Sequence, residues 1–171
     1  EVFSDISSPF NNLYPAKFYF DGLTFSSNEQ FMMLSKAQLF GDYETFDKVM
    51  AVNDNPLVAK FLNGEIKAKD IVNDPGMLNE WSNIQKDIIA LGRGVKNYND
   101  ETWVKEREVW VKEGLDQKFI QNEDLKDALL ATGNKHLVKS GKDADFIICT
   151  KSLIDLNNTI KNVYINGIKA V

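Results

Sequence analysis

The sequence predicts an α+β fold: a mainly helical single domain with a small N-terminal hairpin and a β-rich C-terminal tail. Three observations predict this class. Aromatic runs at residues 17–20 and 23–25 flank Asp21-Gly22, a dipeptide typical of hairpin turns. From there to residue 133, apolar side chains recur at the three- and four-residue spacing of amphipathic helices. Beyond residue 140 the pattern changes to short β-rich runs, with Asn166-Gly167 as a second hairpin turn.

The helices are predicted from their boundary residues. A capping box of Ser26 with Glu29, or of Ser27 with Gln30, precedes the first helix, which Gly41 ends. The later helices each begin at a cap residue or a proline, and the sequence places helices over residues 31–40, 43–52, 56–62, 75–91, 100–119 and 122–131. In the last two, the side chains expected to face inward are Val104, Val111, Leu115, Phe119, Leu125, Leu129 and Leu130.

Composition restricts the class of protein. The chain has 171 residues, 43% hydrophobic and 26% charged, as in an ordinary globular domain. A single cysteine, Cys149, excludes an internal disulfide and a cysteine metal cluster, and one histidine, His136, cannot form a multi-histidine metal site. The net charge of −5 argues against a broad basic surface for nucleic acid. No apolar run approaches the ~20 residues of a membrane helix, so we expect a soluble, cytoplasmic protein without a metal.

Glu29 and Lys36 form the first candidate site. They stand seven residues apart in one predicted helix, so they share a face to within roughly 20° and lie about 10 Å apart along the axis. This separation is too long for an i,i+4 ion pair. Both side chains can lean toward one point, as acid/base or imine chemistry on a sugar requires. The structural alternative is a capping-box carboxylate beside a lysine that extends to solvent.

Two further groups could bind a nucleotide. Trp103, Arg107, Trp110 and Lys118 share a stripe of the long helix, where indoles beside a guanidinium suit a nucleobase and a phosphate. A packed tryptophan cluster, with Arg107 paired to a buried carboxylate, is the alternative. Gly92-Arg93-Gly94 permits an anion site, but a helix C-cap explains the same residues.

The order of the motifs resembles the NADAR superfamily, also called YbiA-like proteins. Its elements appear in sequence as Phe10-Asn11-Asn12-Leu13-Tyr14-Pro15, Phe20-Asp21-Gly22, Glu29-Gln30, Lys36-Ala37, Leu91-Gly92-Arg93, Trp103, Arg107, Lys118-Phe119, Gln121-Asn122, Leu129-Leu130-Ala131-Thr132-Gly133 and Leu137-Val138. The resemblance covers roughly residues 10–138. We therefore expect a YbiA-like domain over residues 1–140 and a divergent extension, packed on the same domain, over 141–171.

The resemblance implies an N-glycosidase that cleaves the bond between a ribose anomeric carbon and an amine nitrogen. The implied substrates are ADP-ribose on a guanine amine of DNA or RNA, or phosphoribosylamino-pyrimidine intermediates of riboflavin synthesis. We favour ADP-ribose, because residues 59–86 look longer than compact relatives need and leave room for a larger substrate. The partners would be these ADP-ribosyl or phosphoribosyl compounds, and no cofactor is implied.

The resemblance also implies residue roles. Lys36 would form a Schiff base with the sugar, and Glu29 would move protons. We expect burial or a nearby arginine to lower the pKa of Lys36, because only the neutral amine attacks. The implied substrate-binding residues, with arginines on phosphates and tryptophans beside the base or ribose, are Asn11, Tyr14, Gln30, Arg93, Trp103, Arg107, Trp110 and Lys118.

The C-terminus departs from the family pattern. Relatives continue into an aspartate followed shortly by Trp-Gly, whereas here Phe146-Ile147-Ile148 stands in place of Trp-Gly. Asp143 or Asp145 can occupy the aspartate position, and we assign Asp145 as the second catalytic acid. Because of this departure, two other functions stay open: a non-catalytic module that binds ADP-ribose or other NAD-derived nucleotides, and a protein-interaction domain.

Overall fold

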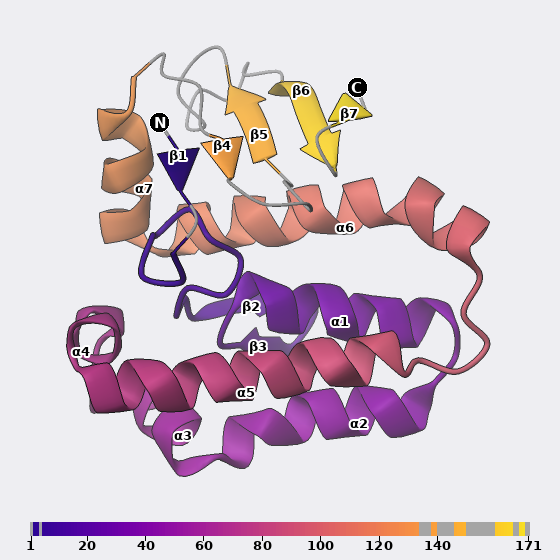
Figure 1. The fold of residues 1–171 in the computed structure, drawn as a ribbon, viewed down its shortest axis with the longest axis horizontal. Helices are drawn as coiled ribbons and strands as arrows, with labels where there is room; N and C mark the ends of the chain where they lie inside the picture. The colour runs from indigo at the N-terminus through magenta and orange to yellow at the C-terminus, as the bar shows by residue number, and fades with distance from the viewer. Residues whose placement is uncertain are drawn as a thin grey trace.

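Helix α1 (Asn28–Leu39) lies at the centre of the helical part of the molecule. In the computed structural model, residues 5–133 are described with their side chains, and beyond them only the backbone of five short strands, at 2–3, 138–139, 146–149, 160–165 and 168–169. Helix α6 (Asp100–Gln121) packs on one side of α1, and α5 (Pro75–Arg93) and α2 (Tyr43–Ala51) pack on the other (Figure 1). The prediction of a mainly helical fold is confirmed.

The N-terminal hairpin is also confirmed. Strands β2 (Phe18–Phe20) and β3 (Leu23–Phe25) pair antiparallel, with Phe18 opposite Phe25. Asp21 and Gly22 both adopt left-handed conformations, with φ of 49° and 79°, as a two-residue hairpin turn requires. The Phe25 ring centroid lies 5.1 Å from that of Phe31 in an edge-to-face contact. The hairpin therefore packs on α1 through its aromatic side chains.

The start of α1 distinguishes between the two predicted capping boxes. Ser27 is the N-cap, and its hydroxyl accepts the Gln30 backbone N–H at 3.1 Å. The Gln30 side chain folds back one residue further than in a standard box, so its Oε1 accepts the backbone N–H of Ser26 at 2.8 Å. Gln30, and not Glu29, therefore completes the cap. At the other end, Gly41 has a φ of 67° and ends the helix as predicted.

The remaining helices include one that the sequence did not predict. Helices α3 (Pro56–Leu62) and α7 (Glu123–Ala131) lie where expected, and a 3-10 helix η1 (Val52–Asp54) precedes α3. Helix α4 (Ala68–Asn73) was missed because its six residues are too few for a periodic pattern, and Ile71 is its one buried residue. Its first turn depends on a local hydrogen bond, in which Lys67 N–H donates to Asp70 Oδ2 at 2.7 Å.

Two of the seven inward-facing predictions are wrong. Val104 is 51% exposed and Leu130 is 39% exposed, whereas Val111, Leu115 and Phe119 are buried as expected. Val104 shares a helical face with Val111, but the first turn of α6 contacts its neighbours through Trp103. Periodicity identifies the face of a helix correctly, but it does not show how far the neighbouring chain extends along that face.

Glycines bring α5 and α6 close to α1. A Cβ at Gly92 of α5 would overlap the Sδ and Cγ atoms of Met33, and one at Gly114 of α6 would overlap Asn28 Oδ1 and the Phe31 ring. Both glycines sit inside helices, where glycine is intrinsically unfavourable. Their role here is therefore the close approach of helix backbones on the two sides of α1.

Outside residues 5–133, the described backbone consists of short strands. Strands β5 (Phe146–Cys149), β6 (Ile160–Ile165) and β7 (Ile168–Lys169) pair antiparallel in that order, and β1 (Val2–Phe3) pairs parallel with β4 (Val138–Lys139). The predicted turn at Asn166-Gly167 lies outside the described residues. The packing of this tail on the helices and the boundary near residue 140 stay predictions. Among the helices of residues 5–133, none is long and apolar enough to cross a membrane.

Substitution of Gly92 by alanine tests the close contact of α1 with α5. The added methyl would overlap Met33, so we expect Gly92→Ala to lower the free energy of unfolding by ~1–3 kcal/mol, as overpacked cores do. Gly94→Ala is the matched control, because its Cβ would lie 3.5 Å from the nearest atom, Leu91 O, an ordinary contact. Urea unfolding measures both variants, and equal stability of the two would contradict the close-contact role of Gly92.

Candidate active site

Lys36 is a buried amine with an unusual set of neighbours. It lies near the end of α1 with only 9% of its surface exposed. Its Nζ donates to the backbone carbonyl of Gly92 at 2.8 Å. The same nitrogen lies 4.2 Å from the ring centroid of Tyr98 and 5.7 Å from that of Trp103. Lys36 therefore does not extend to solvent, and the structural alternative of a surface lysine is wrong.

The environment changes the protonation of Lys36 in the direction that nucleophilic attack needs. Burial lowers the pKa of the Lys36 ammonium, and the negative charge of Asp100 partly opposes this shift. Of the two causes that the sequence suggested, burial rather than an arginine is the one found. The aromatic faces and the Gly92 carbonyl favour the cation, so the amine keeps partners in its charged form as well.

Tyr98 is a residue of this site that sequence reasoning missed. It lies in the segment between α5 and α6, 42% exposed, with its hydroxyl donating to Asp100 Oδ1 at 2.7 Å. Burial and the hydrogen bond to Asp100 raise the pKa of the Tyr98 hydroxyl, while the charge of Arg107 lowers it. No periodic pattern marks Tyr98, because it belongs to a loop whose path is set by tertiary contacts.

Glu29 occupies the first turn of α1 and is half-buried. Its backbone N–H donates to the Asn12 carbonyl at 3.1 Å. Because Gln30 completes the cap, N-capping does not account for the Glu29 carboxylate. A negative charge here is favoured by the dipole of α1. Glu29 and Lys36 thus share one helical stripe as predicted, with the acid at the start of the helix and the amine near its end.

The stripe of α6 that carries Trp103 and Arg107 faces α1. Trp103 lies against Lys36, and the Trp110 ring meets Phe31 of α1 edge to face at 6.2 Å. Arg107 Nε and Trp110 Nε1 are both buried without a hydrogen-bond partner among residues 5–133. The alternative in which Arg107 pairs with a buried carboxylate is therefore not found in this part of the chain. Two donor groups on α6 are thus buried without being satisfied by residues 5–133.

The candidate anion site at residues 92–94 contains two glycines with structural roles and one exposed arginine. Gly92 allows the contact with Met33, and Gly94 is the C-cap of α5, its N–H donating to Ala90 O at 3.1 Å. These glycines are accounted for by structure and do not by themselves indicate a phosphate loop. Arg93 is exposed in the last turn of α5. Its role as a phosphate ligand stays a prediction.

Asn11, Tyr14 and Lys118 form a sealed cluster at the other end of α6. Lys118 is fully buried, and its Nζ donates to the Asn11 carbonyl at 2.8 Å beneath the Tyr14 ring, 5.6 Å away. Burial lowers the pKa of Lys118 to about 7, and burial with the charge of Asp124 raises the pKa of Tyr14. Asn11 and Tyr14 are 2% and 4% exposed. The structure does not bring these three residues to the Lys36 amine.

Two other predicted residues also lie away from Lys36. Gln30 is fully buried, with Oε1 accepting from Ser26 and Nε2 donating to Val49 O and Asn53 Oδ1. Its side chain is saturated by the protein itself, so the candidate site does not include it. Asp145 lies outside the described residues. In residues 5–133, no group of three histidine, cysteine or carboxylate side chains is arranged to hold a metal ion.

A groove of about 560 Å³ between α2 and α5 does not coincide with these residues. Its lining includes Glu44, Lys48, Asp87 and Lys96, and Gly94 is its one residue from the predicted candidate sites. Both lysines are already paired with Glu44, at 2.7 Å and 2.6 Å. The groove is therefore a surface of mixed charge whose lysines are already paired. The candidate active site lies instead between α1 and α6, where Trp103 lies beside Lys36.

The buried Lys118 predicts a pH dependence of stability. Its pKa falls from an ordinary 10.5 to about 7 in the folded chain. Between these values the unfolded chain holds a proton that the folded chain lacks. The free energy of unfolding should therefore rise with pH, by up to about 1.4 kcal/mol per pH unit from this residue. Below pH 7 both states are protonated and the Lys118 contribution no longer changes.

Urea unfolding between pH 7 and 10 measures this effect. Lys118→Met should remove the Lys118 part of the slope, whereas Lys105→Met, at a surface lysine 69% exposed, should keep it. Equal pH slopes for wild type and Lys118→Met would contradict a neutral Lys118 in the folded protein.

Residues 1–148 match the family described as the NADAR domain. The chain is similar to an N-glycosidase of Acanthamoeba polyphaga mimivirus, with 34% identity over 136 residues, which are 77% of this chain and 62% of the viral protein. The chain thus spans about three-fifths of the length of this curated relative. The match over residues 1–148 includes Glu29, Lys36, Arg107 and Trp110, and the chain belongs to the NADAR family.

Proposed function

We propose that this chain is an N-glycosidase that hydrolyses the bond between a ribose anomeric carbon and an amine nitrogen. The observation that carries the proposal is the Lys36 amine, buried between two aromatic rings with its pKa lowered, on one helical stripe with Glu29. The name of the viral relative supports the same reaction class. A lysine nucleophile and a carboxylate that transfers protons are the two groups that an imine mechanism needs.

The proposed reaction starts with opening of the ribose ring. The bond between the ring oxygen and C1 breaks, the substrate nitrogen gives up its proton to the ring oxygen, and an imine forms between C1 and that nitrogen. Neutral Lys36 Nζ adds to C1, so C1 carries two nitrogens. The bond from C1 to the substrate nitrogen then breaks, that nitrogen takes a proton from Glu29, and the electron pair of Nζ forms the Lys36 Schiff base.

Hydrolysis completes the cycle. The Glu29 carboxylate takes a proton from water as its oxygen adds to C1, and the bond between C1 and Nζ breaks as Nζ regains a proton. One water is consumed, and the free amine and the sugar are released. Lys36 returns to its resting contacts with the Gly92 carbonyl and the Tyr98 ring.

We propose ADP-ribosyl-guanine in nucleic acid as the substrate. Support comes from Arg107 Nε and Trp110 Nε1, which are donors without partners in residues 5–133, on the α6 stripe that carries Trp103 beside Lys36. A guanidinium can hold one phosphate, and an indole N–H can bond to a ribose or phosphate oxygen. Arg93, exposed near the Gly92 carbonyl, would serve the second phosphate.

Trapping with borohydride tests the role of Lys36. Wild-type protein mixed with guanine-ADP-ribosylated DNA and borohydride should acquire a sugar adduct on Lys36, located by peptide mass spectrometry. Lys36→Met fills a similar volume without an amine, and its turnover should fall by at least about 10²-fold. Lys105→Met, at an exposed lysine of α6, should react like wild type.

The outcomes separate the competing functions. Equal turnover of Lys36→Met and wild type would remove the Schiff-base role. Binding of ADP-ribose without release from any linkage would make the chain a binding module. Cleavage confined to phosphoribosylamino-pyrimidine would move the substrate to riboflavin intermediates.

Glu29→Gln tests the proton-transfer role separately. The amide keeps the size of the side chain but cannot carry a proton to the leaving nitrogen, so kcat should fall by about 10²- to 10⁴-fold. Gln30→Glu is not a useful control because Gln30 is saturated in the core, but Glu101→Gln changes an exposed carboxylate of α6 and should keep full activity. A Glu29→Gln enzyme with an unchanged kcat would assign the proton transfer to another group.

A further inference from the structure

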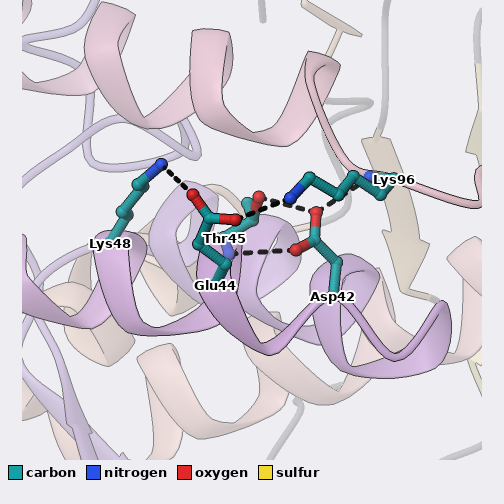
Figure 2. Close-up of polar contacts among 5 residues, drawn as sticks. All are labelled: Asp42, Glu44, Thr45, Lys48 and Lys96. Atoms are coloured by element: carbon teal, nitrogen blue, oxygen red, sulfur yellow. Dashed lines mark hydrogen bonds and ion pairs between the residues drawn. The ribbon is translucent and has the colours of Figure 1, made fainter.

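Asp42 joins three segments of the chain that meet near Lys36. Its backbone N–H donates to Ala37 O of α1 at 2.9 Å. Its carboxylate caps α2, with Oδ1 accepting Thr45 N–H at 3.1 Å and Oδ2 accepting the Thr45 hydroxyl at 2.7 Å. Oδ2 also accepts the backbone N–H of Lys96 at 2.8 Å (Figure 2). The residue is 4% exposed, so these bonds are shielded from water.

The bond to Lys96 fixes the segment that carries Tyr98. This segment runs from Gly94, the C-cap of α5, to Asn99, the N-cap of α6. Asn97 has a φ of 58°, a left-handed conformation that turns the chain sharply between the Asp42 bond and Tyr98. Beyond the turn, the Tyr98 ring lies against Phe40, with 5.4 Å between centroids, and 4.2 Å from Lys36 Nζ.

The ion pair between Lys96 and Glu44, beside this bond, does not explain how the segment that carries Tyr98 is held. Lys96 Nζ contacts Glu44 Oε2 at 2.6 Å, but the two side chains are 64% and 58% exposed. Exposed ion pairs of this kind hold little free energy. The Asp42 carboxylate, by contrast, is buried and accepts three hydrogen bonds, and these bonds lower its pKa to about 2. It is therefore anionic at every pH at which the enzyme would work.

We propose that Asp42 is a positioning residue for Lys36: by holding the backbone of Lys96, it keeps the Tyr98 ring over the Lys36 amine and shields that amine from water. This inference rests on the proposed role of Lys36 for its effect on catalysis. The shielding of the Lys36 amine does not depend on any reaction, so the positioning role of Asp42 and the proposed reaction can fail separately. The hydrogen bonds of the Asp42 carboxylate go to Thr45 on α2 and to Lys96 in the segment before α6.

Asp42→Asn is the first test variant, because asparagine is as good an N-cap as aspartate. Its Oδ1 can still accept Thr45 N–H, but its NH₂ group cannot accept from Lys96. Asp42→Ser is the second variant, since serine also caps a helix but is too short to reach both partners. Glu44→Gln is the matched control, because it breaks the exposed ion pair and leaves the Asp42 bond intact.

The measurement is the rate at which an amine-acylating reagent labels Lys36, followed by peptide mass spectrometry. Loss of one buried hydrogen bond should raise local opening, and so the labelling rate, about fivefold in Asp42→Asn and Asp42→Ser. Glu44→Gln should label like wild type. Tyr98→Ala should label faster as well, and adding Asp42→Asn to it should change nothing further, because both act through the same ring.

Catalysis gives the second readout. Asp42→Asn should lower kcat in the glycosidase assay with little change in KM, because the amine and not the substrate is displaced. Wild-type labelling rates in folded Asp42→Asn and Asp42→Ser would overturn the proposal. So would a labelling effect that adds to that of Tyr98→Ala. If labelling rises as expected but no glycosidase activity exists in the wild type, the positioning of Lys36 stands and the proposed reaction is wrong.

Discussion

The structure depends on the close contact of α1 with α5 on one side and α6 on the other. Gly92 and Gly114 contribute no side chain of their own at these contacts, so Met33, and Asn28 with Phe31, of α1 pack directly against the backbones of α5 and α6. As a result α1 is buried nearly all round, including polar residues that usually face water: Asn28, Gln30, Ser35 and Lys36. Burying such groups costs free energy unless they are hydrogen-bonded within the protein. Ser35 donates to Phe31 O within α1, whereas Gln30 and Lys36 donate to the carbonyls of Val49 and Gly92 on other elements. A helix held in this way has little freedom to rotate or slide, so the position of its lysine is fixed by the whole helical domain.

This constraint explains how Lys36 can be buried and still suit the nucleophilic role proposed for it. An ammonium in a closed apolar pocket loses its hydration, which favours the neutral amine. The Gly92 carbonyl and the rings of Tyr98 and Trp103 replace part of that hydration, so Lys36 tolerates its position in the resting protein. These partners are a single hydrogen bond and two ring faces, which a substrate can exchange for its own contacts. An ion pair with a buried carboxylate would have raised the pKa and held the amine away from reaction. Asp100, whose negative charge acts on Lys36, is engaged by the Tyr98 hydroxyl.

Local sequence predicted the elements and their faces, because caps and periodicity are local properties. The hairpin at Asp21-Gly22, the span of α3 and the shared stripe of Glu29 and Lys36 all follow from neighbours within seven residues. The environment of each side chain could not be predicted from the local sequence, because it depends on contacts with residues far away in the chain. The carbonyl partner of Lys36 is 56 residues away, and that of Lys118 is 107 residues away. Lys118 was predicted to bind substrate from its stripe on α6, but the loop at Asn11 and Tyr14 encloses it. Gly92 suggested an anion loop, whereas Met33 of α1 shows that the glycine is needed for packing.

The two buried lysines show why geometry must be considered before pKa in choosing a nucleophile. The pKa of Lys118 falls from an ordinary 10.5 to about 7, close to neutrality, and pKa alone would select this amine. Its side chain, however, has no exposed surface, and its Nζ is closed in by Asn11 and by the rings of Tyr14 and Phe119. A nucleophile must reach a carbon atom of its substrate, and Lys118 would need the Asn11 loop to unfold first. Lys36 keeps 9% of its surface, and the ring that covers it belongs to a tyrosine that is itself 42% exposed. Displacement of one partly exposed side chain opens the way to Lys36. Access therefore favours Lys36 as the reactive amine, and leaves Lys118 as the residue that ties the N-terminal loop to α6.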